Sequence, residues 1–371
     1  MRKRKMKNYK LLTPGPLTTT ETVKEVMLFD HCTWDDDYKE ITQKIRRDLL
    51  KLAQVSEEEY TTVLMQGSGS FGVESVLGSV IPKDGCVLLL SNGAYGERAA
   101  KMCSYYEIPC IHVTQDYNKT PDAKEAEEFL KTHPEITHIM MIHSETTSGI
   151  LNDIESIGEL AKKYGKAFIV DAMSSFAGVE IPMKDWHIDF LISSANKCIQ
   201  GVPGFSFIIA NRALLMESKG RARSLCLDLY DQWAGMEKDG KWRYTSPTHV
   251  VLAFEQAMKE LQQEGGIKAR HARYQKNMDT LVENFEKLGF RLYVDRAWQG
   301  PIIATFLYPE GKHFDFQDMY AYIKERGYAI YPGKLTDADT FRIGNIGEIY
   351  PEDMEKLAQI IHDFLNEKKE A

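Results

Sequence analysis

Two side chains suited to chemistry, a carboxylate and an amine, follow two apolar segments of the sequence. The segment AFIVDAMSS is apolar up to Asp171, and DFLISSANK is apolar until a few residues before Lys197. Their separation, 197 − 171 = 26 residues, leaves room for one helix and one strand. Ligands of open α/β sheets bind at the carboxyl ends of the strands. We therefore expect both side chains to project into one crevice.

A glycine-rich loop earlier in the chain adds an anion-binding feature. The strand-like YTTVLM leads into QGSGS at 66–70 and then into FGVESVLGSVI, which has helical spacing. A turn from a strand into a helix directs backbone N–H groups and the positive end of the helix dipole at one point. The loop therefore predicts an anion site, and a plain glycine turn between strand and helix is the alternative.

The same loop satisfies G-x-G-x-x-G through Gly67, Gly69 and Gly72, a spacing typical of dinucleotide sites. A dinucleotide site also needs an acidic residue about 20 positions further on, at the end of the next strand. That segment ends Leu90-Ser91-Asn92, without a carboxylate. A cofactor with a single phosphate therefore explains the loop better than a pyrophosphate does.

An amine, a carboxylate and a phosphate cradle around one crevice indicate pyridoxal 5'-phosphate chemistry. Lys197 would form a Schiff base with the cofactor's aldehyde, and Asp171 would keep the pyridine nitrogen protonated. Tyr95, which follows the second predicted strand in SNGAYGER, is placed to stack on the ring. The alternatives are a solvated surface lysine, an aspartate that forms a turn or caps a helix, and a tyrosine half-buried against its helix.

Short apolar segments alternate with helical patterns between about residues 60 and 209, which is typical of a mostly parallel sheet covered by helices. Seven strands are predicted, at 61–65, 87–90, 110–113, 138–142, 167–170, 190–193 and 205–209. A helical pattern at 154–164 is the clearest of the intervening segments. We therefore predict an α/β domain with a mostly parallel seven-stranded sheet.

The remainder of the chain is less regular and predicts a smaller α+β domain. Pro247 can open a helix that Gly265-Gly266 can end. Further helices are predicted at 267–288, 316–326 and 351–368, with strands at RLYVD (291–295) and IIATFLY (302–308). The predicted division is an N-terminal arm at 1–20, a large cofactor-binding domain at 21–264 and a small C-terminal domain at 265–371.

Composition limits the class of partner. The 371 residues carry 46 basic and 54 acidic side chains, a net charge of −8 that argues against a nucleic-acid binder. Six cysteines without a C-x-x-C pair indicate neither a zinc site nor a disulfide framework, so we expect no metal and a reducing cytoplasm. No apolar segment fits a signal peptide or a membrane span, and we interpret Lys3, Arg4 and Lys5 as a solvated tail.

The motifs together resemble the 2-aminoethylphosphonate:pyruvate transaminase family, a fold-type I group of pyridoxal-phosphate enzymes in the branch of the alanine:glyoxylate and serine:pyruvate transaminases. The segments that carry the resemblance span nearly the whole chain: LLTPGPLTTT (11–20), HCTWDDDY (31–38), GSGSFGVES (67–75), NGAYGER (92–98), HSETTSGILND (143–153), VDAMSSF (170–176), SSANKCIQGVPG (193–204), YTSPTHVVLAFEQA (244–257) and FRIGNIG (341–347). Departures are small: Ser70 stands where the family more often has threonine, and Ser206 where it has glycine.

The resemblance assigns a role to each matching residue. It implies that Lys197 is the Schiff-base lysine, Asp171 the pyridinium partner, Ser68, Gly69 and Ser70 the phosphate cradle, Tyr95 the stacking ring, Thr146 a hydrogen-bond partner of the cofactor's ring oxygen or its neighbours, Arg342 the anchor for the substrate's anion, and Thr245 a contact to the cofactor phosphate of the neighbouring subunit.

The function that the resemblance implies is transfer of an amino group from 2-aminoethylphosphonate to pyruvate, giving phosphonoacetaldehyde and L-alanine, in a homodimer. An alanine or serine aminotransferase of the same branch, acting with glyoxylate or pyruvate, is the first alternative. The second is a non-catalytic scaffold that binds phosphate metabolites. From the residues alone, the sequence supports a phosphate-bearing cofactor, a Schiff-base lysine and an anionic substrate, with no membrane or nucleic-acid partner.

Overall fold

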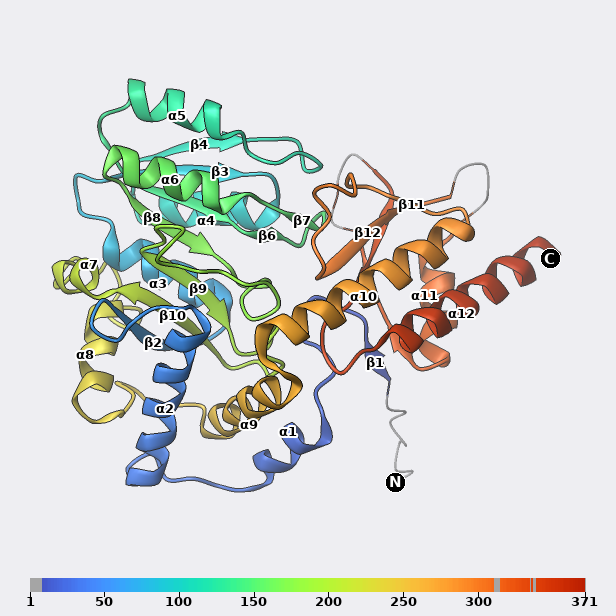
Figure 1. The fold of residues 1–371 in the computed structure, drawn as a ribbon, viewed down its shortest axis with the longest axis horizontal. Coiled ribbons are helices and arrows are strands. Elements are labelled where there is room, and N and C mark those ends of the chain that lie inside the picture. The colour runs from blue at the N-terminus through green and yellow to red at the C-terminus, as the bar shows by residue number, and fades with distance from the viewer. Residues whose placement is uncertain (1–8, 310–313, 334, 336–337, 371) are drawn as a thin grey trace.

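The computed structural model describes residues 9–309, 314–333, 335 and 338–370. Lys3, Arg4 and Lys5, interpreted as a solvated tail, lie outside the described residues. In Figure 1 a large sheet with its covering helices occupies one side of the molecule, and a smaller sheet with the last three helices occupies the other. The first of these three helices, the long α10 (Gly266–Lys287), begins beside the large part and extends along the smaller sheet.

Seven strands of the described chain form the main sheet, in the order β2-β10-β9-β8-β5-β3-β4. Their bounds are β2 (Tyr60–Gln66), β3 (Cys86–Ser91), β4 (Cys110–Thr114), β5 (Ile136–Ile142), β8 (Ala167–Asp171), β9 (Phe190–Ser194) and β10 (Phe205–Asn211). Within this sheet β10 pairs antiparallel with both neighbours and the other pairs are parallel. The predicted strands and the predicted α/β fold are confirmed, with every strand end within two residues.

Helices cover both faces of this sheet because alternate strand residues point to opposite faces. Leu88 and Leu90 of β3 belong to one buried cluster, and Val87 and Leu89 to the other. The first face is covered by α2 (Asp36–Leu52), α5 (Ala123–Thr132), α6 (Ile154–Tyr164) and α9 (Thr248–Glu264), and the second by α3 (Gly69–Val80), α4 (Ala94–Tyr105) and α8 (Leu229–Asp239). The shorter α1 (Glu21–Glu25) and the 3₁₀ helix Val26–Leu28 contact α9, and α7 (Arg212–Glu217) contacts β10.

The smaller sheet has its own apolar core, built around Phe285, Phe306 and Phe341. Its strands are β11 (Arg291–Leu292), β12 (Ile303–Leu307), β15 (Thr340–Gly344) and β14 (Tyr331–Pro332), and the helices beside it are α10, α11 (Phe316–Glu325) and α12 (Pro351–Glu370). The predicted helices are confirmed. The strand predicted at RLYVD is wrong beyond its first two residues, because the chain enters a turn at Asp295, whose carboxylate accepts from the backbone N–H of Ala297.

The N-terminal segment joins the two parts of the molecule. β1 (Lys10–Leu11) pairs in parallel with β13 (Tyr328–Ala329), and the backbone N–H of Gly344 donates to the Leu12 oxygen at 3.0 Å. Leu12 is fully buried in the core of the smaller sheet. The predicted division of the chain at residues 20 and 264 stays a proposal, which the two separate apolar cores support.

Helix α9 begins and ends at the residues expected from their chemistry. Pro247 stands at its N-cap, and Gly265 ends it in the left-handed conformation with φ 110°. Across the described part of the chain, no helix combines the length and apolar character that a bilayer crossing requires.

Candidate active site

A pocket of about 260 Å³ lies at the carboxyl ends of the parallel strands, where the sequence predicted a crevice. Six predicted residues line it: Ser68, Gly69, Ser70, Tyr95, Asp171 and Lys197. Val73, Arg98, Ala99, Met102, Met173, Ser194 and Asn196 complete the lining. The fold therefore brings together an amine, a carboxylate and a helix N-terminus that lie far apart in the sequence.

Asp171 ends β8 and is almost completely buried. Its Oδ1 accepts a hydrogen bond from the backbone N–H of Met173 at 2.9 Å. Burial raises the pKa of this carboxyl to about 6, because removal from water disfavours the charged form more than this hydrogen bond and the nearby Lys197 favour it. A positively charged N–H partner in the pocket would restore the ionised state.

Lys197 lies in the loop after β9, and its Nζ donates to the backbone oxygen of Pro14 at 2.8 Å. The N-terminal segment passes so close that a Cβ added at Gly15 would lie 2.9 Å from Nζ. Pro14 was not among the predicted site residues, because nothing local to Lys197 indicates a contact with this distant segment of the chain.

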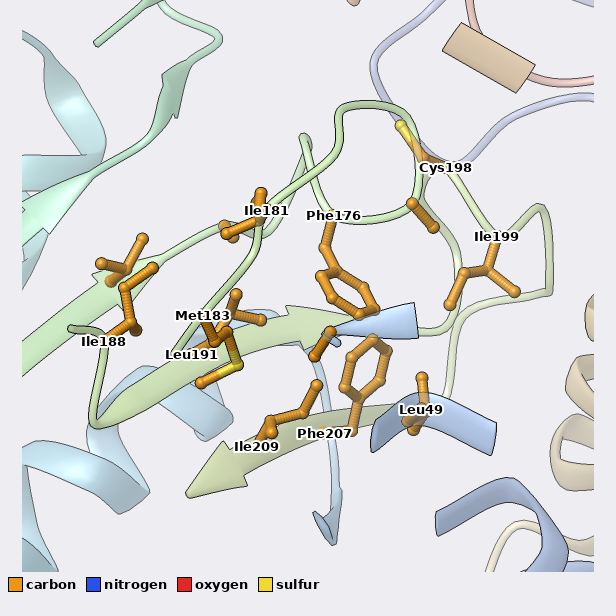
Figure 2. Close-up of a cluster of buried hydrophobic side chains, with 14 of the residues drawn as sticks. Leu49, Phe176, Ile181, Met183, Ile188, Leu191, Cys198, Ile199, Phe207 and Ile209 are labelled. Atoms are coloured by element: carbon orange, nitrogen blue, oxygen red, sulfur yellow. The ribbon is translucent and has the colours of Figure 1, made fainter. Parts of the chain in front are cut away.

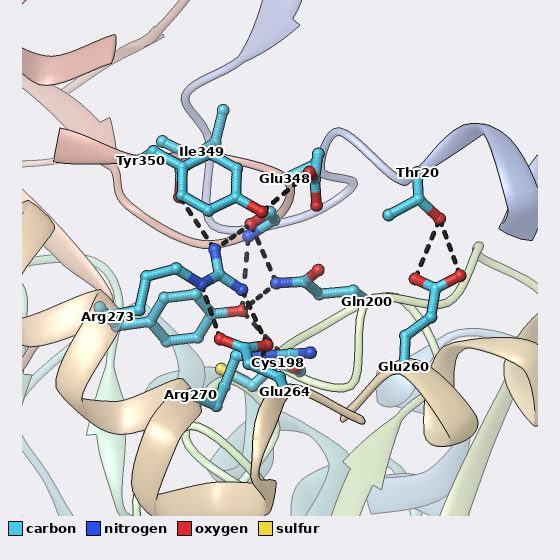
Figure 3. Close-up of polar contacts among 12 residues, drawn as sticks. Thr20, Cys198, Gln200, Glu260, Glu264, Arg270, Arg273, Glu348, Ile349 and Tyr350 are labelled. Atoms are coloured by element: carbon cyan, nitrogen blue, oxygen red, sulfur yellow. Dashed lines mark hydrogen bonds and ion pairs between the residues drawn. The ribbon is translucent and has the colours of Figure 1, made fainter. Parts of the chain in front are cut away.

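The residues that follow Lys197 are fixed from both sides. Cys198 and Ile199 are buried in the apolar cluster of Figure 2, where Phe176 and Phe207 meet edge to face. On the other side, Arg270 Nη1 of α10 donates to the Cys198 oxygen at 2.5 Å (Figure 3). Because these contacts hold the loop in place, Lys197 needs little reorganisation to react with a ligand in the pocket.

Gln200 extends the same support to the smaller sheet. Its Nε2 donates to the Tyr274 hydroxyl at 2.6 Å and to the Gly347 backbone oxygen at 2.9 Å (Figure 3). Tyr274 comes from α10, and Gly347 follows β15. The lysine loop is therefore tied directly to the part of the molecule that carries Arg342.

The glycine loop forms the N-terminus of α3, as predicted. Ser68 is the N-cap residue, yet its side chain makes no capping hydrogen bond, so its hydroxyl is available to a ligand at this helix end. Gly67 has φ 111°, a backbone conformation that favours glycine. At Gly69 an added Cβ would overlap the sulfur of Met173, so a residue with a side chain would require the Met173 side chain to move.

Tyr95 and Arg98, both on α4, form the wall of the pocket next to the glycine loop. Arg98 Nη1 donates to the Ser70 hydroxyl at 3.1 Å, and its guanidinium lies 5.0 Å from the centroid of the Tyr95 ring. Sequence reasoning missed Arg98. The available signal was its spacing, because a residue three positions after Tyr95 on a helix shares its face.

Thr146 and Arg342 do not line the pocket, although they contact each other next to it. Arg342 Nη1 donates to the Thr146 backbone oxygen at 2.9 Å, and Nε donates to the Pro332 oxygen at 3.0 Å. Burial lowers the pKa of Arg342. Among the described residues no carboxylate forms an ion pair with Arg342, so the structural salt bridge that an arginine usually makes is not what holds it there.

Thr245 also lies outside the pocket lining and is exposed. The neighbouring Ser246 is buried, with its hydroxyl 2.7 Å from that of Tyr38. Neither side chain caps α9, whose N-cap residue is Pro247.

The arrangement can hold an anion at the N-terminus of α3, next to the cation of Arg98. It can also present a nucleophilic amine and a buried carboxylate to one flat, phosphate-bearing molecule between them. These features fit pyridoxal 5'-phosphate: a cradle for its phosphate, an amine for its aldehyde and a carboxylate that gains from a protonated ring nitrogen.

Comparisons with known proteins lead to the same chemistry. A family model described as aminotransferase class-V matches residues 31–341. The 2-aminoethylphosphonate–pyruvate transaminase of Lysinibacillus sphaericus (strain C3-41) is 56% identical over 360 residues, covering 97% of this chain and 98% of that protein. The bifunctional phosphonoacetaldehyde hydrolase/aminoethylphosphonate transaminase of Clostridioides difficile (strain 630) is 54% identical over 360 residues, covering 97% of this chain and 57% of that protein.

Solved structures share the fold at much lower sequence identity. The pyridoxamine-pyruvate aminotransferase of Mesorhizobium loti superimposes with a TM-score of 0.89 at 22% identity, over 99% of this chain and 94% of that one. The alanine–glyoxylate aminotransferase of Nostoc sp. has the same TM-score and identity, over 97% of both chains.

Proposed function

The chain belongs to the aminotransferase class-V family, and from that membership we propose that it transfers the amino group of 2-aminoethylphosphonate to pyruvate, with pyridoxal 5'-phosphate as cofactor. The products are phosphonoacetaldehyde and L-alanine. One observation carries the proposal: relatives at 54–56% identity over nearly the whole chain bear this activity in their names. The meeting of Asp171, Lys197 and the α3 N-terminus in one pocket supports it.

The cofactor's phosphate is proposed to bind at the N-terminus of α3. Backbone N–H groups of the first turn and the hydroxyls of Ser68 and Ser70 are the donors, and the helix dipole adds to the attraction. Arg98, which already contacts Ser70, supplies a full positive charge beside them. Tyr95 covers the ring from the α4 side.

When bound, pyridoxal 5'-phosphate supplies an aldehyde that bonds to amines and a ring that accepts electron density from the reacting carbon of the substrate. The negative charge of Asp171 would keep the ring nitrogen protonated. In turn, the protonated nitrogen would offset the cost of burying this carboxylate. Lys197 provides the covalent attachment and, when its amine is free, takes the proton from the substrate carbon that carries the nitrogen and returns it.

Arg342 is proposed to hold the anionic end of each substrate, and Thr146 to hydrogen-bond the cofactor's ring oxygen or its neighbours. The phosphonate of one substrate and the carboxylate of the other must occupy the same place, so that their reacting carbons meet Lys197 in the same way. A buried guanidinium that contacts backbone oxygens and forms no ion pair within the described residues is suited to such an anion.

The proposed assembly is a homodimer in the cytoplasm, with Thr245 reaching the cofactor phosphate of the neighbouring subunit. Thr245 is exposed in the single chain, as a residue directed at a partner must be. Exposed apolar residues adjoin it: Tyr244 is 45% exposed, and Leu225, whose backbone oxygen accepts from Arg243, is 73% exposed. All six cysteines are free, which supports a reducing compartment.

An amino-donor screen tests the proposed function. Purified protein is loaded with pyridoxal 5'-phosphate, and kcat/KM is measured for 2-aminoethylphosphonate and serine with pyruvate as acceptor, and for alanine and serine with glyoxylate as acceptor. The proposal expects 2-aminoethylphosphonate with pyruvate to give the highest value. If alanine or serine is the better donor, the phosphonate assignment is wrong while the aminotransferase assignment stands. Binding of phosphate compounds without any turnover would favour the non-catalytic alternative.

A further inference from the structure

Glu145 is a buried carboxylate beside the pocket that the proposed chemistry does not use. It ends the two-residue strand β6 (Ser144–Glu145), which forms a hairpin with β7 (Ile150–Leu151), and its exposed fraction is 0%. Burial raises its pKa, which reflects the cost of keeping the carboxylate away from water. A carboxyl group buried in this way needs hydrogen-bond partners within the protein.

The donors come from the start of α4 and from the hairpin itself. Tyr95 N–H donates to Glu145 Oε2 at 3.3 Å, and Thr147 N–H donates to Oε1 at 3.0 Å. The hydroxyl of Thr147 accepts from the backbone N–H of Ala94 at 3.2 Å. The N-cap residue of α4 is Gly93, which has no side chain to satisfy these groups. The hairpin therefore caps a helix that cannot cap itself.

The fit between this carboxylate and α4 is tight. A Cβ added at Gly93 would overlap the carboxyl group of Glu145. Gly93 has φ 175°, an extended conformation that any residue can adopt, so the backbone does not require glycine here. Glycine is needed because a side chain at this position would occupy the space of the Glu145 carboxyl group. Tyr95, two residues later, lines the pocket.

The hairpin also contacts the residue proposed to hold the substrate. The backbone oxygen of Thr146, next to Glu145, accepts from Arg342 Nη1 at 2.9 Å. One side of this short segment thus faces the helix of Tyr95, and the adjoining peptide faces Arg342.

We infer that Glu145 is a positioning residue of this site: by capping α4 it fixes the Tyr95 ring against the cofactor, and its hairpin links that ring to Arg342. The inference rests on the proposed function, because the role of Tyr95 requires that the ring of pyridoxal 5'-phosphate binds next to it. Glu145 acts through the backbone of α4 and touches neither substrate nor cofactor.

The test is cofactor affinity, measured by absorbance when pyridoxal 5'-phosphate is titrated into cofactor-free protein. Glu145→Gln keeps the size of the side chain but replaces one acceptor oxygen by an NH₂ group that faces a backbone N–H. We expect the dissociation constant to rise by about ten-fold or more, with a shifted absorption maximum of the bound cofactor. An unchanged constant and spectrum would overturn the inference.

A double-mutant cycle with Tyr95→Ala separates positioning from a general structural role. If Glu145 acts through Tyr95, Glu145→Gln adds little to the loss already caused by Tyr95→Ala. If the two losses multiply, Glu145 does not act through Tyr95 and the inference is wrong. Should wild-type protein itself fail to bind the cofactor, the proposed function fails, an outcome separate from any effect of Glu145.

Two further variants guard against misfolding as an explanation. Asp189→Asn alters a half-buried carboxylate, which accepts from Phe168 N–H and Asn211 Nδ2 at 3.0 Å each and lies outside the pocket. It should lower the melting temperature without changing cofactor affinity. If Glu145→Gln does not fold, Gly93→Ala, which displaces the carboxylate from the opposite side, should give the same loss of affinity, and wild-type affinity there would refute the inference.

Discussion

At the scale of the residue, Asp171 shows a conflict between stability and function. Its folded-state pKa of about 6 lies above the value of about 3.9 that an unfolded chain gives. The native state therefore binds the proton more tightly, so the stability linked to this group is complete at acid pH and falls as the pH rises through 6. A cofactor that brings a positive N–H group would reverse this cost.

We predict that Asp171→Asn stabilises the cofactor-free protein above pH 6 while it removes activity. The shift of about two pKa units corresponds to about 3 kcal/mol, so the advantage of the variant should grow between pH 4 and pH 6 and then level off. The rate should fall on the order of 10²–10³-fold, because an amide cannot hold a ring proton by charge. Urea unfolding across this pH range measures the stability difference between variant and wild type, and steady-state kinetics measure the loss of rate. A stability difference that is the same at pH 5 and pH 8 would contradict the first prediction.

Lys197→Ala should abolish both covalent cofactor attachment and turnover, since no other amine lines the pocket within the described residues. Loss of the absorbance band of the attached cofactor is the direct measurement. Lys184→Ala, at an exposed lysine paired with Glu59, is the matched control and should leave both unchanged. Retention of the band in Lys197→Ala would place the attachment on another residue.

Arg342 should matter for both substrates. Arg342→Lys keeps the charge but loses the two-pronged geometry, so KM should rise for 2-aminoethylphosphonate and for pyruvate. Arg342→Ala should cost about 2–5 kcal/mol of transition-state binding if the ion pair with the substrate is desolvated. Values of kcat/KM for each substrate in both variants check this. An alanine variant that handles both substrates normally would remove the anchor role.

At the scale of the element, the close packing of helices depends on glycines inside them. Helix propensity alone would favour alanine at these positions. Gly158 of α6 lies against the backbone oxygen of Trp186, where an added Cβ would overlap it. At Gly235 of α8 an added Cβ would lie 3.7 Å from the Lys241 backbone oxygen, an ordinary van der Waals contact. The two helical glycines therefore make a matched pair.

Gly158→Ala should destabilise the protein by about 1–3 kcal/mol, because α6 must move away from backbone that cannot yield. Gly235→Ala should stabilise it by about 0.5–1 kcal/mol, because alanine loses less entropy in a helix. Chemical denaturation of both variants against wild type is the measurement. A gain in stability for Gly158→Ala would show that α6 is free to shift.

Elements with strong local signals were predictable, and contacts between distant segments were not. The seven strands and the strand-to-helix turn at 66–70 follow from periodicity and glycine spacing, which act over a few residues. Pro14 was missed because it lies 183 residues before Lys197 in the sequence, and no local pattern indicates a contact over that separation. Glu145 stands in the same segment as the predicted Thr146, but its partner, the first turn of α4, becomes visible only once the helices are packed.

At the scale of the whole molecule, we predict a homodimer that is required for full cofactor affinity. Sedimentation velocity should give the mass of two chains. Leu225→Glu, at an exposed leucine near Thr245, should weaken the dimer and lower cofactor affinity with it, because a charge buried in an interface is costly. Thr245→Ala should lower cofactor affinity without changing the mass. A fully active monomer would contradict the assembly.

The pairing of β1 with β13 has a consequence for how the enzyme is made. Strand β1 is synthesised before every strand of the main sheet, but its partner Tyr328–Ala329 and the strand that carries Arg342 are synthesised after all of them. Until then the segment around Pro14 lacks the strand that fixes it, although Lys197 and Asp171 have already emerged. A nascent chain can therefore complete the main sheet before it holds a finished catalytic site.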